Sequence, residues 1–295
     1  MRKPLKLNKK SKAELEKVRQ LYQPLDRISE TYSKAIQRQV SKMKRTMMGA
    51  FRQRIVPIIR EYEKEKSKKL ATNSSEELER LLEKYTTLVA LEIAATMAKI
   101  QEFFDERAMS QIVERFSRAM CEAQRRILLA EIFEESGEVN RSIYQHLRNG
   151  ASDIEEIREE FMEDNLAFLP LTIPVEYMER VQKEIVEGME KGRSISDMTA
   201  QINEYGAMGD RRAAFLANDQ VGAFSLALAA FNASLLGFGS FQWVTMNDDL
   251  VRPEHAALDG MVFTWFYGTG LKGKNGQPLY PGSDFGCRCI ARAVI

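Results

Sequence analysis

Apolar residues recur at intervals of three and four along the first half of the chain, which is the spacing of one face of an α-helix. The first such stripe runs from Ile28 to Tyr62. Pro57 lies inside it, and we expect a kink or break there because proline has no N–H and its ring collides with the preceding turn. The charged segments that flank the stripe, residues 1–25 and 61–69, are expected to be exposed.

Two further long helices are predicted before the middle of the chain. Residues 73–75 are Asn-Ser-Ser, a typical N-cap, and two glutamates follow that favour a helix N-terminus. We predict a helix from there to about residue 105, and another over about residues 109–135 that ends at Ser136-Gly137. Narrow apolar stripes on long helices favour a helical bundle, with contact to other subunits as the alternative.

The second half of the chain changes character. Two prolines within residues 168–174 predict a break, and we interpret this stretch as a linker between a helical region, residues 1–170, and a C-terminal domain, residues 174–295. Helices are predicted over about 175–189, after Ser194, and over about 211–236, where Gly237 and Gly239 end the last one.

Alternation of apolar and polar residues then predicts three short strands, over residues 241–245, 261–266 and 289–295. The predicted fold class is therefore mainly α with a small C-terminal α+β domain. Long N-terminal helices would be followed by further helices and a short antiparallel sheet.

The composition sets limits on the class of protein. With 295 residues, 44% of them hydrophobic, the chain can bury a sizeable core. An uninterrupted apolar run of about 18 residues, the length of a membrane span, is missing, and the basic N-terminus lacks the apolar segment of a secretory signal. Three cysteines do not make a disulfide framework, so we expect a protein of cytosolic origin.

Charge is distributed unevenly. Residues 1–70 contain 21 Lys/Arg and 7 Asp/Glu, whereas the remainder contains 22 and 35. A basic arm of this kind indicates a polyanion or an acidic protein surface as partner, and a solvated helix face is the alternative. The arm's aromatic residues Tyr32, Phe51 and Tyr62 lie on the apolar stripe. Contact with DNA through residues 1–70 would therefore be independent of base sequence.

The residues with the most distinctive chemistry lie near the C-terminus. His255, Cys287 and Cys289 could supply three zinc ligands, with Asp249 or Asp259 as the fourth. The alternative is two buried thiols, or a pair that oxidises, holding the C-terminal strand in place.

A glycine-rich stretch, residues 268–275, fits two phosphate-binding patterns, except that Asn275 stands where the P-loop has Ser or Thr. Gly276 and Pro278 follow, so no helix N-terminus is expected to face a phosphate. We predict a mobile loop between strands.

Asp248 or Asp249 could form an acid–base cluster with Arg252 and His255. The chain has no motif for a nucleophile to accompany it. We interpret Asp249, Arg252 and Asp259 instead as hydrogen-bonding and ion-pairing groups that hold the loop after the first strand.

The C-terminal segment carries a motif of fixed order and spacing: Trp243, Thr245, Asp248 or Asp249, Val251, Arg252, His255, Gly260, Pro281, Gly282, Cys287, Arg288 and Cys289. On these residues the segment resembles the phage Mu F-like head morphogenesis family, and the likeness reaches upstream to about Pro174. Residues 217–220 depart from the family: they are Ala-Asn-Asp-Gln where it often has Ala-Arg-Thr-Glu, so no role of that arginine or glutamate is carried over.

The resemblance implies a minor capsid protein of a tailed phage or prophage that is not an enzyme. It implies association with the portal protein, contact with the major capsid or scaffold protein and with packaged DNA, and no membrane. The expected location is the virion, in the capsid interior or at the portal vertex, and the host cytoplasm during assembly. Family members with cysteines at the positions of Arg252 and His255 would hold zinc with four cysteines.

Two other functions remain open. One is a nucleotide-dependent, transferase-like enzyme that uses the C-terminal domain. The other is a toxin-delivery module, which is disfavoured because only six residues follow Cys289.

Overall fold

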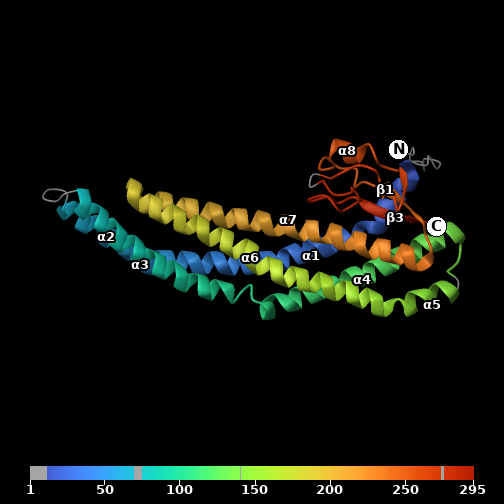
Figure 1. Ribbon diagram of the computed structural model, residues 1–295, viewed down its shortest axis with the longest axis horizontal. Coiled ribbons are helices and arrows are strands. Elements are labelled where there is room, and N and C mark those ends of the chain that lie inside the picture. Colours follow the sequence, from blue (N-terminus) through green and yellow to red (C-terminus); the bar gives the residue numbers. More distant parts are fainter. Residues whose placement is uncertain (1–11, 70–74, 140, 274–275) are drawn as a thin grey trace. The chain divides into compact units, whose positions relative to one another are not determined.

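The computed structural model of the chain describes residues 12–69, 75–139, 141–273 and 276–295 (Figure 1). It is mainly helical with a small three-stranded antiparallel sheet near the C-terminus, so the predicted fold class is confirmed. The elements are α1 (Lys12–Ala50), the π-helical turn η1 (Phe51–Ile55), α2 (Val56–Lys69), α3 (Ser75–Gln101), α4 (Glu106–Ser136), α5 (Arg141–Asn149), α6 (Ala151–Lys191), α7 (Ile195–Leu236), β1 (Ser240–Val244), α8 (Pro253–Ala256), β2 (Val262–Thr264) and β3 (Ile290–Val294).

These elements form two compact units, each assembled from segments that are distant in the sequence. Unit 1 comprises Met1–Ser33, Val113–Asp164 and Ala214–Ile295. Unit 2 comprises Lys34–Ile112 and Asn165–Ala213. Helices α1, α4, α6 and α7 each contribute to both units.

Unit 2 is built on the apolar stripe predicted from the sequence. The stripe residues Ile36, Val40, Met43 and Met47 of α1 are fully buried. The interruption expected at Pro57 takes the form of a π-helical turn, and the chain stays helical through it: η1 follows α1 directly, and α2 begins one residue before the proline. The N–H of Val56 donates to the carbonyl of Phe51, five residues earlier, and this wider turn makes room for the ring of Pro57. Beyond the turn, α2 lies beside α3 (Figure 1).

The predicted exposure of residues 1–25 is wrong where the structure describes them. Helix α1 begins at Lys12 and continues through Pro24. Leu15, Val18, Tyr22 and Leu25 recur at intervals of three and four and are buried in unit 1. This packing offsets the hydrogen bond that Pro24 removes. Residues 1–11 of the basic arm lie outside the described residues.

Two other predicted helix breaks are also wrong. The linker predicted at residues 168–174 lies within the continuous helix α6, whose buried residues Leu169 and Ile173 extend one packed face through it. The gap predicted before residue 211 lies within α7. Gly206 and Gly209 bring α7 close to α1 there, since a Cβ on Gly209 would lie 3.2 Å from Val40. The division into regions 1–170 and 174–295 stays a prediction.

Unit 1 combines helices with the sheet. The three predicted strands are confirmed, in the order β2-β1-β3 with both pairings antiparallel. Phe241 pairs with Phe263 and Ala293, so these three side chains share one face of the sheet. Gln242 pairs with Val262 and Arg292 on the opposite face.

Helix α7 is long and apolar enough to cross a membrane by length and composition alone. The core helix of a protein that crosses no membrane passes the same test. In α7, Leu216, Phe224 and Leu228 are buried, as expected for a core helix. The expectation that no membrane is involved stays a prediction.

Candidate functional site

The structure brings three of the predicted metal ligands together in unit 1. His255 Nδ1 lies 3.5 Å from Cys287 Sγ and 3.7 Å from Cys289 Sγ. The three side chains are buried, and their ligand atoms all lie within 4.8 Å of one another. The exposed residue Asp249 does not belong to this group. We call His255, Cys287 and Cys289 the Cys–His cluster.

Backbone geometry sets the positions of these side chains. Arg252 has an extended backbone and Pro253 starts α8, so His255 sits in a single helical turn that follows the loop after β1. Gly282 has a φ of +84°, which a side chain would strain, and its N–H lies 3.4 Å from Cys287 Sγ. The N–H of Cys289 also lies 3.4 Å from that sulfur. Two backbone N–H groups therefore point at Cys287.

The two cysteines differ in acidity. A hydrogen bond from Cys289, together with those from His255 and the two backbone N–H groups, lowers the pKa of Cys287 to about 4. The hydrogen bond to Cys287 and burial raise the pKa of Cys289 well above its ordinary value. The pair therefore favours a thiolate at Cys287 and a protonated thiol at Cys289, sharing one proton.

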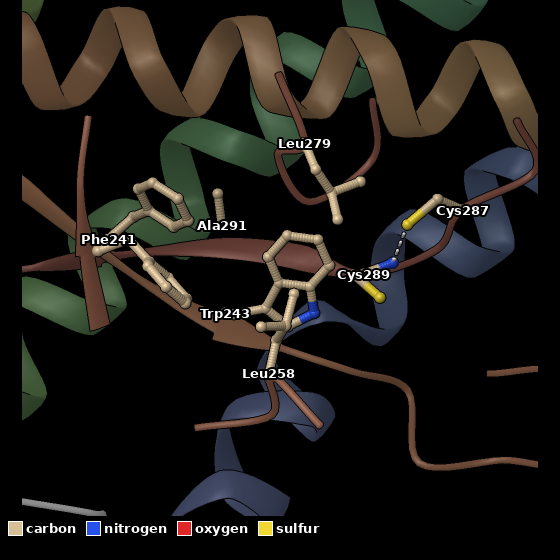
Figure 2. Packing of buried hydrophobic residues seen from close by; sticks show 8 residues of the cluster. Phe241, Trp243, Leu258, Leu279, Cys287, Cys289 and Ala291 are labelled. Atoms are coloured by element: carbon tan, nitrogen blue, oxygen red, sulfur yellow. Dashed lines mark hydrogen bonds between the residues drawn. The ribbon is translucent and has the colours of Figure 1, made fainter. Parts of the chain in front are cut away.

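An apolar wall surrounds the cluster. Trp243 is fully buried and its ring meets the His255 ring edge-on, with centroids 5.4 Å apart. Figure 2 shows Trp243 between Leu258 and Leu279, with its indole nitrogen on the side of Cys289. That nitrogen is buried, and its N–H is directed at the Cys289 thiol, where it partly offsets the groups that raise the pKa of Cys289.

Polar groups hold the outer side of the cluster. Asp284 is buried and accepts a hydrogen bond of 2.9 Å from Arg252, and it lies 3.7 Å from His255 Nε2. Arg252 also donates to the carbonyl of Phe285. The N–H of Gly286 donates to Asp219 of α7, 2.8 Å away, so the helix that departs from the family pattern still supports this loop. Asp284 was not predicted from the sequence, although it lies between the motif residues Gly282 and Cys287.

A second polar group holds the loop after β1. Asp259 accepts hydrogen bonds of 2.8 Å from the N–H of Thr245 and 2.8 Å from Arg19 of α1. Arg19 also donates to the carbonyl of Thr245, 2.7 Å away. The partner of Asp259 is therefore Arg19, at the start of the chain, and not Arg252. No local pattern in the sequence indicates this pairing, since 240 residues separate the two.

The remaining motif residues lie around the same loops. Gly260 has a φ of +77°, and its N–H donates to the carbonyl of Trp243. Pro281 is buried beside Gly282, and Arg288 pairs with Asp248.

The glycine-rich loop leaves a turn at residues 265–269, and Lys272 then bridges to Pro278. Among the described residues that follow, β3 is the one regular element, so no helix begins behind this loop. Residues 274–275, including the proposed P-loop position Asn275, lie outside the described part.

The segment that holds these residues is similar to a known protein family. Residues 179–292 match the sequence model of the family described as phage Mu protein F like protein. This segment belongs to that family. The Mu F-like segment includes the whole Cys–His cluster, together with parts of both units. The family indicates a role in phage head morphogenesis.

One curated relative is a protein of Haemophilus influenzae described as uncharacterized. It is 30% identical over 124 residues, which cover 42% of this chain and 26% of the relative. The chain therefore matches about a quarter of the length of that relative. No solved structure is significantly similar to the chain.

Proposed function

We propose that this chain is a minor capsid protein of a tailed phage or prophage, which associates with the portal protein during procapsid assembly and affects DNA packaging or release. The observation that carries the proposal is the match of residues 179–292 to the phage Mu F-like family. On this proposal the chain acts in the host cytoplasm during assembly and then resides in the virion, in the capsid interior or at the portal vertex.

We propose a structural role for the Mu F-like segment and no catalytic step. Its motif residues hold backbone: Gly282 and Gly260 form turns, and Asp259 caps the end of β1. The cavity that borders Cys289 has a volume of about 40 Å³, whereas pockets for small-molecule substrates measure about 300–1,000 Å³. A larger open hollow of about 640 Å³ on α6 and α7 is lined mainly by charged side chains that pair with one another, such as Arg193 with Glu184. The backbone roles of the motif residues and the small cavity at the Cys–His cluster support the structural role over the transferase-like alternative.

A basic stripe on unit 2 supports docking through the N-terminal helix. Exposed side chains follow one face of α1 and the turn after it, at intervals of four, three and seven residues: Arg38, Lys42, Arg45 and Arg52. Because residues at these spacings lie on one side of a helix, their charges act together. Such a stripe suits an acidic protein surface or the phosphate backbone of packaged DNA.

The experiment is co-purification of the full chain with the portal protein of the same phage, at low and at high salt. We expect retention at low salt that weakens at high salt, because exposed charges are screened. The triple variant Arg38→Gln/Arg45→Gln/Arg52→Gln should be retained at least about 10-fold less, a loss of about 1.4 kcal/mol of binding free energy.

The matched control removes the same number of charges elsewhere. Arg118, Arg126 and Arg180 are exposed arginines that each pair with a glutamate four residues earlier, and their triple change to Gln should leave retention unchanged. Mass spectrometry of purified virions provides the second readout. A chain that is absent from virions, and that neither the portal, the major capsid protein nor the scaffold retains, would contradict the proposal.

A further inference from the structure

The Cys–His cluster points to a second property, which does not depend on the role in head assembly. We propose that His255, Cys287 and Cys289 bind a zinc ion through one imidazole nitrogen and two thiolates, and that Asp284 orients the imidazole. The ion would join α8 to the start of β3, two segments that are more than 30 residues apart in the sequence.

The first argument is geometric. Zinc binds thiolate sulfur at about 2.3 Å and imidazole nitrogen at about 2.0–2.1 Å, with tetrahedral angles. A nitrogen and a sulfur on one tetrahedral zinc ion are therefore about 3.6 Å apart. The distances from His255 Nδ1 to the two sulfurs are 3.5 Å and 3.7 Å. Both nitrogen–sulfur distances thus match those that the ion requires, and the two sulfurs lie within 4.8 Å of each other.

The second argument concerns the imidazole. Its Nδ1 faces the two sulfurs, while its Nε2 lies 3.7 Å from Asp284. Histidines that bind metals commonly direct their second nitrogen to a carboxylate, which fixes the tautomer and makes the free nitrogen a better ligand. Arg252 donates to Oδ2 of Asp284, the same oxygen that lies 3.7 Å from His255 Nε2, so it holds the carboxylate beside the imidazole.

The third argument concerns charge and burial. Zn²⁺ binds thiolates, and one dication beside two thiolate anions leaves no net charge in the apolar interior. The N–H groups of Gly282 and Cys289 point at Cys287 Sγ, and such N–H groups support a metal-bound thiolate. The buried indole N–H of Trp243 lies on the side of Cys289 and supports the second sulfur in the same way.

Three protein ligands leave a fourth position for water or another exogenous ligand. Asp249, the fourth ligand considered from the sequence, is exposed and outside the cluster. Asp259 holds Arg19 and the backbone of Thr245 instead. A bound ion therefore has two sulfurs and one imidazole nitrogen as its protein ligands.

The experiment measures metal on the full chain, purified under reducing conditions. We expect zinc and protein in equal molar amounts by mass spectrometry of the metal. Replacement of zinc by Co²⁺ should give sulfur-to-cobalt charge-transfer absorption in the near ultraviolet and the visible bands of a tetrahedral ion. Cys287→Ser and Cys289→Ser should each lose the zinc, and with it the charge-transfer absorption of the cobalt-substituted protein.

Two variants serve as matched controls. Cys121→Ser removes a free cysteine of α4 outside the cluster, and Asp249→Ala removes the excluded carboxylate, so both should keep the full metal content. Asp284→Asn should keep the cobalt spectrum but bind the ion about 10–100-fold more weakly, as expected for a residue that positions a ligand.

If the cysteine variants do not fold, X-ray absorption of the zinc-loaded wild-type chain provides the second measurement. Two sulfur neighbours per zinc, with the remaining neighbours nitrogen or oxygen, would support the proposal. A reduced wild-type chain that holds no zinc and gives no cobalt spectrum would overturn it. Metal that survives in both cysteine variants, or fewer than two sulfur neighbours per zinc, would also overturn it.

Discussion

At the scale of single residues, two glycines of the Mu F-like segment, Gly222 and Gly282, lie backbone against backbone. A Cβ on Gly282 would lie 2.5 Å from the carbonyl oxygen of Gly222 in α7, and a Cβ on Gly222 would lie 2.7 Å from the carbonyl oxygen of Cys287. Both obstacles are backbone atoms, which cannot rotate away. Gly282 in addition has a φ of +84°. The two glycines thus let α7 approach the loop that carries the cysteines.

We predict that Gly282→Ala lowers the free energy of unfolding by more than about 2 kcal/mol, because left-handed strain and overpacking add. Gly222→Ala should cost less, since alanine favours the helix by about 1 kcal/mol and offsets part of the clash. Urea denaturation measures both. The control is Gly49→Ala in α1, where nothing lies within 4 Å of the new Cβ, and which should gain about 0.5–1 kcal/mol. Equal effects of all three changes would contradict this account.

Single residues also show what the sequence can and cannot predict about the site. His255, Cys287 and Cys289 stood out because they are rare and closely placed in one segment, and the structure puts them together. Asp284 and Arg19 did not stand out. Both act through contacts that form only after folding, and charged residues are too common in this chain for their type alone to indicate a role.

At the scale of elements, a buried polar network joins α1, α4 and β3 in unit 1. Arg292 of β3 lies 3.4 Å from Glu131 and 2.9 Å from Glu135, and Tyr22 of α1 donates to Glu131 over 3.0 Å. Arg292 and Glu131 are almost fully buried. Burial, together with the charge of Glu131, raises the pKa of Tyr22 well above its ordinary value, so its hydroxyl stays a donor.

We predict that Arg292→Met destabilises the chain by about 3–5 kcal/mol, because the charge of Glu131 is then buried without its partner. Arg292→Met/Glu131→Gln should recover most of this loss, since the charge is gone and the amide oxygen still accepts from Tyr22. Chemical denaturation of the three proteins tests this. The control Arg126→Met breaks an exposed pair with Glu122 and should change stability by less than about 0.5 kcal/mol. A double variant as unstable as the single one would contradict the network.

The elements also show where pattern reasoning fails. Prolines in residues 168–174 predicted a break, and the helix after Ser194 was expected to end before residue 211, yet α6 and α7 continue through these positions. Intrinsic preference is a weak influence when a helix face is buried along its whole length. At Pro57 the chain stays helical as well, because the π-helical turn η1 accommodates the proline while Phe51 and Ile55 stay buried.

At the scale of the whole molecule, neither compact unit is continuous in the sequence. Unit 1 contains the first part of α1 and the second part of α4 together with the C-terminal sheet. Unit 2 contains residues 34–112 together with residues 165–213. The predicted boundary near residue 174 followed local composition, which carries no information about such pairings. The segment that matches the phage Mu F-like family, residues 179–292, likewise contains only part of each unit.

We therefore predict that the fragment 174–295 does not fold by itself. It lacks Arg19, which holds Asp259 and Thr245, and it lacks Glu131 and Glu135, which pair with Arg292. It should keep helical far-ultraviolet circular dichroism but lose near-ultraviolet signal, bind a hydrophobic dye and show weakly protected amides, whereas the full chain unfolds cooperatively. A fragment with sharp near-ultraviolet bands and a cooperative transition would place a domain boundary at residue 174. It would also mean that the sheet folds without its contacts to α1 and α4. Because this result is open, the portal-binding experiment uses point variants of the full chain.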